Sequence, residues 1–397
     1  MSNMKIVIAA DLHWPTINGV ATFSRNLAQG LAAKGHDVTV IAPSQTGKRY
    51  EEKDKNYIIK RTMAVPFPFY QNFRISVSPY REVKRIIEAI QPDIIHVQGI
   101  LGIGRAALAV GKRMDIPVVA TNHAIPDNLL DNLRLLAPFA RPFSYALTEY
   151  GRHFHSNADY VTLPTMAAIK MFGDETKKIT APIVAISNGI DLSRFAPGKA
   201  PKELYERFSI PQDKKIITYL GRLDSEKHVH SLLKAAKQVF ETVDTHLLIV
   251  GSGNDLESLK SLSEKLAITD RITFTGRVSD EDIVQLHKVG SVFCVTSPAE
   301  LQCIAALEAM ASGQPLVAVD AGALYELCQD GKNGYLCRTD DIEQIAEKLT
   351  AVLTNEPLRK KFAKASLAIA KTHDLKHTIS RFEEVYAEVL KRKENSL

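Results

Sequence analysis

Short apolar segments alternate with helix-forming segments along nearly the whole chain, and this alternation limits the possible folds more than any other feature. Residues 5–10 are apolar, a helical segment follows to about Lys34, and a second apolar run covers residues 37–42. A strand–helix–strand unit of this kind requires a parallel sheet with helical crossovers. Further strands are predicted at 93–97, 116–120, 159–163 and 183–187. We therefore predict that the first part of the chain is a Rossmann-like α/β domain.

The pattern returns after a break near residue 190. Asn188 and Gly189 form a turn dipeptide, and the segment 196–202, rich in Pro, Lys and Ala, is typical of a linker. Strands are then predicted at 215–220, 246–250, 271–275, 291–296 and 316–319. A chain of 397 residues is long enough for two domains. We predict domains at 1–190 and 191–375, with a C-terminal helix in 376–397 that packs back on the first domain.

Charge is distributed unevenly between the two predicted domains. Residues 1–190 hold 22 Lys and Arg against 15 Asp and Glu, which leaves 28 against 30 for residues 191–397 from the totals of 50 and 45. A basic first half indicates an anionic surface or substrate for that half, although ordinary scatter of surface lysines gives the same excess. The sequence has neither the basic cluster nor the aromatic platform that is typical of nucleic-acid-binding proteins, so nucleic-acid binding is disfavoured.

Membrane-spanning and secreted classes are disfavoured. The chain has no run of eighteen apolar residues, and residues 1–14 lack the features of a signal peptide. The spacing of Cys294, Cys303, Cys328 and Cys337 fits neither a zinc site nor a redox pair, so we expect buried, reduced thiols. A cytoplasmic location is the expectation, with peripheral contact at the inner face of the cell membrane as an extension of it.

The segment 297–318 carries the strongest chemical signal. Glu300 and Glu308 lie eight residues apart, so on one helix they would project from roughly the same face. A predicted strand precedes this segment and another follows it. The positive end of a helix favours phosphate, and a carboxylate beside it can accept hydrogen bonds from sugar hydroxyls. The alternative is two solvated glutamates on a surface helix.

Two basic residues follow the predicted strand 215–220. Arg222 offers a fork of donors and Lys227 a mobile charge, so together they could bind a diphosphate, although two such residues are commonly just solvated. Gly251 and Gly253 follow the next strand. A glycine pair is a weak signal alone, and here it favours close approach of a base or ribose to the backbone.

In the first domain, ligands are expected beyond the carboxyl ends of the strands. Gly19 and Val20 fall there, and the glycine either eases a turn or lets a phosphate or sugar approach. His123 follows the strand at 116–120, where it could contact a ligand or be a satisfied structural histidine. The segment 129–150, in which Arg134 and Arg141 alternate with Leu, Phe and Tyr, is typical either of a helix on a membrane surface or of one packed on its own sheet.

Taken together, these motifs resemble those of the retaining GT-B glycosyltransferases of family 4 (GT4). The resemblance rests on five stretches that occur in the same order: N-G-V at 18–20, His123, N-G-I-D at 188–191, G-R-L-D-S-E-K at 221–227 and E-x7-E at 300–308. It spans nearly the whole chain. It implies two Rossmann-like domains with parallel sheets facing across a cleft, and transfer of a sugar from a nucleotide diphosphate sugar.

The resemblance also implies roles for single residues. Glu300 would contact the donor sugar and His123 would orient it. The remaining residues would bind the donor, with the phosphates, ribose or base as partners: Arg222, Lys227, Glu308, Gly19, Val20, Gly251, Ile304 and Ala305. No D-x-D motif stands where it would serve, so we expect no metal and no cofactor, and positive side chains with a helix dipole would stabilise the departing diphosphate.

The acceptor is indicated less directly. Many members have an aromatic residue and a glycine where this chain has Gln302 and Cys303, and a positive φ at Cys303 would add strain of about 1 kcal/mol. This polar pair, the segment 65–70 and the basic first half resemble lipid-directed members, so a diacylglycerol-like acceptor and UDP-glucose as donor are favoured. A soluble sugar, sugar phosphate or polyol acceptor, a nucleotide-sugar epimerase and an inactive scaffold are the alternatives.

Overall fold

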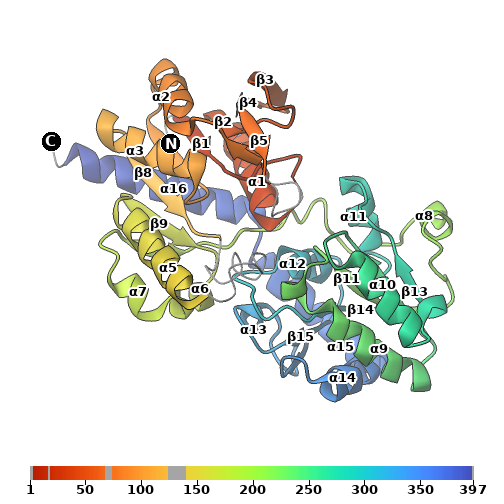
Figure 1. Cartoon of the computed structure of the whole chain (residues 1–397). Helices are drawn as coiled ribbons and strands as arrows, with labels where there is room; N and C mark the ends of the chain where they lie inside the picture. Colours follow the sequence, from red (N-terminus) through yellow and green to blue (C-terminus); the bar gives the residue numbers. More distant parts are fainter. Residues whose placement is uncertain (1–2, 17, 68–73, 124–139, 396–397) are drawn as a thin grey trace. The chain divides into compact units, whose positions relative to one another are not determined.

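The computed structural model describes residues 3–16, 18–67, 74–123 and 140–395, which fold into two compact units (Figure 1). The first contains residues up to Asn188 together with the segment from Leu375 onward, and the second runs from Gly189 to Asp374. Each unit is an α/β domain built on a mainly parallel sheet. The predicted fold class of two Rossmann-like domains is confirmed.

The first unit contains an eight-stranded sheet in the order β10-β9-β8-β7-β1-β2-β4-β3, in which only the edge pair β3–β4 is antiparallel. Its strands are β1 (Lys5–Ala9), β2 (Asp37–Pro43), β3 (Tyr50–Asp54), β4 (Tyr57–Thr62), β7 (Ile94–Val97), β8 (Val118–Thr121), β9 (Tyr160–Leu163) and β10 (Ile183–Ala185). Its helices are α1 (Gly19–Ala33), α2 (Pro79–Ile90), α3 (Gly102–Met114), α5 (Ala140–Ser156), α6 (Met166–Met171), α7 (Gly173–Lys177) and α16 (Leu375–Glu394). The strand order reverses between β1 and β7, which is where such sheets bind ligands.

Two features of this unit were not predicted. The hairpin β3–β4 lies in a segment that was not predicted to be a strand, and its charged residues suit the edge of a sheet. A small two-stranded sheet, β5 (Ala64–Pro66) with β6 (Arg74–Ser76), occupies part of the aromatic segment near residue 70. Residues 68–73 and 124–139, which include Arg134 and half of the segment 129–150, lie outside the described residues.

The C-terminal helix α16 belongs to the first unit, where it packs against α1 and completes the core. Ile379, Phe382 and Tyr386 are fully or almost fully buried. The contact is close, because a Cβ atom at Gly30 would lie only 2.5 Å from the side chain of Ile379. Glycine in the middle of α1 therefore lets the two helices meet.

The second unit contains an all-parallel sheet in the order β13-β12-β11-β14-β15-β16. Its strands are β11 (Lys215–Leu220), β12 (Thr245–Val250), β13 (Ile272–Phe274), β14 (Val292–Val295), β15 (Leu316–Val319) and β16 (Gly334–Cys337). The main helices are α8 (Lys202–Arg207), α9 (Val229–Thr242), α10 (Leu256–Lys265), α11 (Asp280–Leu286), α12 (Ile304–Ala311), α13 (Leu324–Leu327), α14 (Ile342–Thr354) and α15 (Glu356–Lys371). This is the strand order of a doubly wound nucleotide-binding sheet, and it reverses between β11 and β14.

The strands of the second unit are buried on both faces, as their continuous apolar sequences predict. The core on one side joins β11 and β12 to α9 and α14 through leucines and valines such as Leu232 and Leu349, which are fully buried. The four cysteines are buried and unbridged, as expected.

Candidate functional site

The carboxyl ends of β11 and β14 hold the densest group of charged side chains that the sequence singled out. Arg222 and Lys227 lie in the loop after β11, and Glu300 lies in the loop after β14. Because β11 and β14 are the strands between which the order reverses, this edge is the expected ligand position of the second unit.

The loop after β11 is held by hydrogen bonds from several directions. The hydroxyl of Tyr219 donates to the carbonyl of Arg222 at 2.9 Å. The two terminal nitrogens of the Arg222 guanidinium pair with the carboxylates of Asp224 and Glu226, which are both buried. Asp224 also accepts from the backbone N–H of Asn254 at 3.0 Å. Arg222 is therefore fixed by two acidic neighbours that the sequence analysis did not assign.

Lys227 and Glu300 form an ion pair across the two loops, with Nζ 2.7 Å from Oε1. Burial lowers the pKa of Lys227, but the charge of Glu300 and the hydrogen bond to it, together with the charge of Glu226, outweigh burial and raise this pKa above its usual value. The hydroxyl of Thr296, at the end of β14, donates to the carbonyl of Lys227 at 2.9 Å. The lysine is thus held as a cation.

The backbone at Glu300 is fixed by the next loop of the sheet. Its carbonyl accepts from the N–H of Ala323 at 2.8 Å. Gly322 has φ +57°, and a Cβ atom there would lie 2.6 Å from the same carbonyl oxygen. Only glycine fits this close approach, which sets the direction of the Glu300 side chain.

Helix α12 begins at Ile304, which corrects one sequence-based expectation. Glu300 lies in the loop before the helix, so Glu300 and Glu308 do not project from one helical face. Cys303, the N-cap residue, has φ −80°, so the strain considered for a positive φ does not arise. Ile304 and Ala305 are the first two residues of α12, whose first turn holds no acidic side chain. Backbone N–H groups at this position suit an anion.

Glu308 is more enclosed than the sequence suggested, with only 8% of its surface exposed. Its Oε2 lies 3.1 Å from Nε2 of His287, which is itself 2% exposed. Gln314 donates to the carbonyl of His287 at 2.8 Å and fixes that residue in turn. His287 was missed because no pattern in the sequence connects two side chains twenty-one residues apart on different helical segments.

Gly251 has a structural reason for being glycine. It has φ +139°, and a Cβ atom would lie 1.9 Å from the carbonyl oxygen of Gly221. The loops after β11 and β12 could not approach each other with any other residue at this position. The requirement for glycine is therefore explained by backbone contact within the sheet edge, without a ligand.

In the first unit, the candidate residues lie at the corresponding edge of the sheet. Gly19 and Val20 are the first two residues of α1, whose N-cap Asn18 accepts from the N–H of Ala21 at 2.8 Å. His123 follows β8, and its Nε2 lies 2.7 Å from Oε1 of Gln98, which follows β7. Burial lowers the pKa of His123 to about 3, so its imidazole is neutral near pH 7.

The N-terminus of α3 in the same unit is already filled by the protein. The carboxylate of Asp11, just after β1, accepts from the N–H groups of Ile103 at 2.8 Å and Gly104 at 3.4 Å. Burial raises the pKa of Asp11, while these backbone hydrogen bonds lower it. This helix end is therefore already occupied by the Asp11 side chain and is not available to a phosphate.

One group of side chains within the described ranges has the composition of a metal site. His228, His230 and Asp340 bring ligand atoms within 4.8 Å of one another. Nδ1 of His228 already lies 2.9 Å from Asp340, and the hydroxyl of Ser231 donates to the same carboxylate at 2.5 Å. These contacts account for the positions of His228 and Asp340 without an ion. Within the same ranges, no helix combines the length and the apolar composition needed to cross a bilayer.

Comparison with known families gives two matches that together cover most of the chain. The model described as "Glycosyltransferase Family 4" matches residues 17–194, and the model described as "Glycosyl transferases group 1" matches residues 202–368. These two segments correspond to most of the first unit and to most of the second.

Similar proteins were found both by sequence and by structure. The α-monoglucosyldiacylglycerol synthase of Streptococcus pneumoniae is 27% identical over 340 residues, which are 84% of this chain and 75% of that protein. A GDP-mannose-dependent α-mannosyltransferase of Corynebacterium glutamicum is 28% identical over 344 residues, or 86% and 78% of the two chains.

Two solved structures show the same fold. The sucrose-phosphate synthase of Thermosynechococcus elongatus superposes with a TM-score of 0.78 at 18% identity, over 98% of this chain and all of the other. The Anabaena HepE protein in complex with UDP and glucose gives 0.74 at 18% identity, over 97% of this chain and all of the other.

Proposed function

We propose a specific transfer reaction for this chain, which belongs to glycosyltransferase family 4 and has the GT-B fold. Members of this family transfer a sugar from a nucleotide sugar with retention of configuration. For this chain we propose a metal-independent transfer of a hexose from a nucleotide diphosphate sugar, with UDP-glucose as the favoured donor. The proposed acceptor is a hydroxyl of a membrane lipid such as diacylglycerol.

The observation that carries the proposal is the ion pair of Lys227 with Glu300 at the edge where the strand order reverses. Lys227 would bind the diphosphate there, and Glu300, in contact with it, would bind the hexose of the same donor. Arg222 would bind the same diphosphate through its planar fork. The N–H groups of Ile304 and Ala305 would add backbone donors to the phosphate oxygens.

The remaining candidate residues would complete the donor site. Glu308 would accept from the ribose hydroxyls with the oxygen that His287 does not contact, and Gly251 would lie near the base or ribose. From the first unit, Gly19 and Val20 would approach the donor, and His123 would orient the hexose. His287 would keep Glu308 in place.

The existing ion pairs explain how Arg222 and Lys227 stay charged and in place without a bound donor. A cation left unpaired in a partly buried loop is costly, and the carboxylates of Asp224, Glu226 and Glu300 neutralise Arg222 and Lys227 before the donor arrives. When a diphosphate binds, its oxygens would share these cations with the carboxylates. Fixed positive groups then stabilise the charge that develops on the departing diphosphate.

In the proposed reaction, the bond between the anomeric carbon and the β-phosphate oxygen breaks while the acceptor oxygen bonds to the same face of that carbon. A phosphate oxygen of the leaving group takes the proton of the acceptor hydroxyl. This route needs no separate protein base, and retention of configuration follows because attack and departure share one face.

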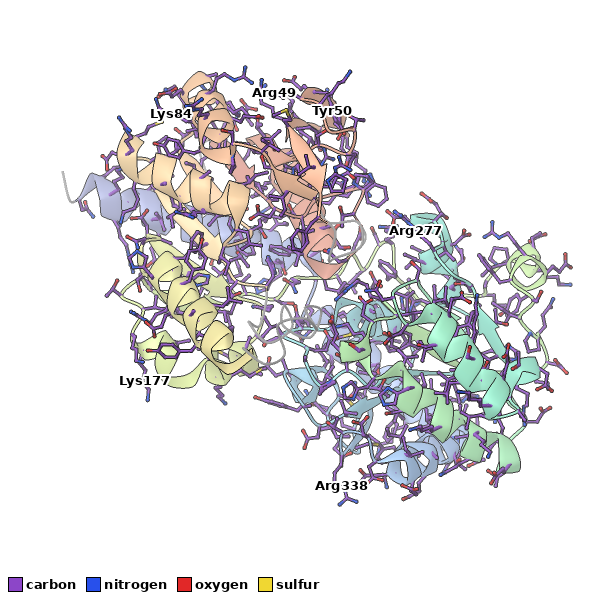
Figure 2. The ribbon with its side chains drawn as sticks, viewed as in Figure 1. Arg49, Tyr50, Lys84, Lys177, Arg277 and Arg338 are labelled. Atoms are coloured by element: carbon purple, nitrogen blue, oxygen red, sulfur yellow. The ribbon has the colours of Figure 1, made fainter. Side chains whose placement is uncertain are left out.

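A lipid acceptor is supported by the surface of the first unit. Tyr145 on α5 and Met166 on α6 are 70% and 53% exposed, and Met171 at the end of α6 is exposed as well. Lys170 on α6 and Lys177 on α7 are also exposed, and Figure 2 shows Lys177 projecting outward. Apolar and basic side chains together suit the surface of an anionic membrane. The S. pneumoniae relative is named for a glucosylated diacylglycerol product.

The experiment is a transfer assay with radiolabelled UDP-glucose. Diacylglycerol in vesicles that contain anionic lipid is compared with glycerol, glucose and glucose 6-phosphate as acceptors, and the anomeric configuration of the product is determined by NMR. The proposal predicts an α-linked glucolipid. Transfer to a soluble acceptor alone would favour the alternative in which a sugar, sugar phosphate or polyol is the acceptor. Conversion of the donor sugar without any acceptor would indicate an epimerase.

The donor is tested separately with GDP-mannose, because the C. glutamicum relative is GDP-mannose-dependent. The true donor should stabilise the protein in a thermal unfolding assay by mass action. UDP-glucose is expected to raise the melting temperature more than GDP-mannose at equal concentration. The reverse order would replace glucose by mannose in the proposal.

A further inference from the structure

A line of hydrogen bonds runs through the first unit from the C-terminal helix to His123. Tyr386 on α16 contacts His96 on β7, with the Tyr hydroxyl 2.6 Å from Nδ1. Nε2 of His96 lies 3.0 Å from Nε2 of Gln98, and Oε1 of Gln98 lies 2.7 Å from Nε2 of His123. His96, Gln98 and Tyr386 are all at most 2% exposed. Figure 1 shows α16, in blue, within this unit.

The direction of each hydrogen bond follows from the atoms that meet. The amide nitrogen of Gln98 can only donate, so Nε2 of His96 must accept. Burial lowers the pKa of His96 to about 3, so its ring is neutral, and its one hydrogen must then be on Nδ1, pointing to Tyr386. The hydroxyl of Thr121 also lies 2.6 Å from Nε2 of His96, and it can donate to the hydroxyl of Thr162 at 2.7 Å.

The same reasoning continues to His123. The amide oxygen of Gln98 can only accept, so Nε2 of His123 must carry the hydrogen. The neutral ring then has an unprotonated Nδ1, which is a hydrogen-bond acceptor. The ring plane is fixed as well, because its centroid lies 4.9 Å from that of Phe23, which in turn contacts Phe382 of α16 at 5.7 Å.

We propose that Gln98 and His96 are positioning residues that hold His123 as the tautomer protonated on Nε2, so that Nδ1 accepts a hydrogen bond from a hydroxyl of the donor sugar. The proposal rests on the proposed function of His123 as the residue that orients the sugar. It also gives α16 a role besides packing, since Tyr386 anchors the other end of the line.

An accepting nitrogen selects for a hydroxyl at the position that it contacts. A donor lacking that hydroxyl would leave a buried acceptor without a partner, which is costly. A charged imidazolium would present a donor instead and lose the contact. The titratable groups along the line are His96 and Tyr386. Burial raises the pKa of the Tyr386 hydroxyl, and the charge of Glu383 on α16 raises it further. None of them places a carboxylate against His123.

The first test is the nitrogen NMR spectrum of the full chain labelled with ¹⁵N-histidine, with the His123 signals identified by their loss in His123→Asn. The expected result is a protonated Nε2 and an unprotonated Nδ1 for His123. Gln98→Leu, which retains a similar volume, should give a mixture of the two tautomers. A proton on Nδ1 in the wild type, or an unchanged single tautomer in Gln98→Leu, would overturn the proposal.

The second test is a double-mutant cycle on turnover. Gln98→Leu and His123→Ala are each expected to lower kcat/KM by about tenfold, the order of one hydrogen bond to a substrate hydroxyl, and the double variant should lose no more than either alone. Val389→Ala, a buried residue of α16 outside the line, is the control for general loss of packing. It should lower stability and leave the tautomer and kcat/KM unchanged.

A third variant separates positioning from structure. Gln98→Glu keeps an acceptor for Nε2 but adds a negative charge, which raises the pKa of His123. The acid limb of the rate–pH profile should then move to higher pH, and an unchanged profile would contradict the proposal. If His123→Ala keeps full turnover, the sugar contact fails together with the proposed role of His123, whereas the NMR result still decides the tautomer.

Discussion

Nζ of Lys227 lies 2.7 Å from Oε1 of Glu300, and this contact joins the two loops at which the strand order of the second sheet reverses. The lysine follows β11 and the glutamate follows β14, so seventy-three residues of chain separate them. A parallel sheet brings such distant residues together because the carboxyl ends of neighbouring strands share one edge. Both side chains are largely buried, so water screens the attraction between their charges only weakly.

Replacing Glu300 by Gln should lower kcat by about a hundredfold, because an amide of the same shape has neither the charge nor the second accepting oxygen to hold the sugar as it transfers. The measurement is the initial rate of transfer at saturating donor. Glu347→Gln, on the exposed surface of α14, is the matched control and should leave the rate unchanged. Undiminished turnover of Glu300→Gln would remove this residue from the reaction.

Arg222→Lys keeps the charge and removes the two-pronged geometry. Arg222 contacts Asp224 and Glu226 through two separate nitrogens of a planar group, and a single ammonium cannot reproduce that fork, so the loop should lose order and the diphosphate would lose a bidentate contact. KM for the donor should rise by about tenfold. Arg338→Lys is the control, because that side chain is 83% exposed at the surface of the second unit (Figure 2). Equal KM values for the two variants would contradict the role of Arg222.

The stability of the first unit should fall in mild acid. Burial lowers the pKa of His13, His96 and His123 to about 3 and that of His155 to about 4, whereas in the unfolded chain each group titrates near 6.5. The unfolded chain therefore binds more protons below pH 6.5, and each histidine lowers the free energy of unfolding by up to about 1.4 kcal/mol per pH unit. The stability is present above pH 6.5 and is lost as pH falls.

Urea unfolding between pH 5 and 7 measures this slope. The fluorescence of Trp14 is a suitable signal, because it is the one tryptophan of the sequence and lies in the unit that holds all four histidines. His13→Gln should reduce the slope by about one proton, and Val389→Ala should lower stability with the slope unchanged. An equal slope in His13→Gln would contradict the assignment. Burial raises the pKa of Asp11, which opposes the trend in its own titration range.

Removal of divalent metal should not slow the reaction. In the proposed site, the positive charges facing the diphosphate would come from Arg222, Lys227 and the N-terminus of α12, and in the cluster of His228, His230 and Asp340 the carboxylate already accepts hydrogen bonds from within the protein. The initial rate with EDTA should equal the rate without it. The initial rate of Asp340→Asn should likewise be the same with and without EDTA. A loss with EDTA that Mg²⁺ or Mn²⁺ restores would show that a metal takes part.

The buried strands were predictable because buried parallel strands are short, continuous apolar runs, as at Lys215–Leu220 and Leu316–Val319. The hairpin β3–β4 was not, since its residues are mostly charged and its strand character comes from pairing at the edge. Local composition also placed the start of α12 too early, because Leu301 to Cys303 are compatible with a helix, whereas α12 begins at Ile304 and the next loop binds the carbonyl of Glu300.

The candidate site was predictable in its cations and carboxylates but not in their pairing. Spacing identified Arg222, Lys227 and Glu300, whereas the contact of Lys227 with Glu300 and that of His287 with Glu308 depend on how distant segments meet in space. Asp224 and Glu226 lie in the same loop as Arg222, but its sequence does not say that they pair with the guanidinium. Single-residue patterns contain no such information. The line from Tyr386 to His123 was equally hidden, since 290 residues separate Tyr386 from His96.

The most direct measurement is a calorimetric titration of UDP into the wild type and into Lys227→Ala. If Lys227 binds the diphosphate, UDP binds the wild type, the variant loses at least about tenfold in affinity, and the affinity difference shrinks as salt screens the charges. Arg338→Ala, which removes an exposed cation, should bind UDP like the wild type. Equal affinity of the wild type and Lys227→Ala for UDP would contradict the assignment of this edge of the sheet to the donor.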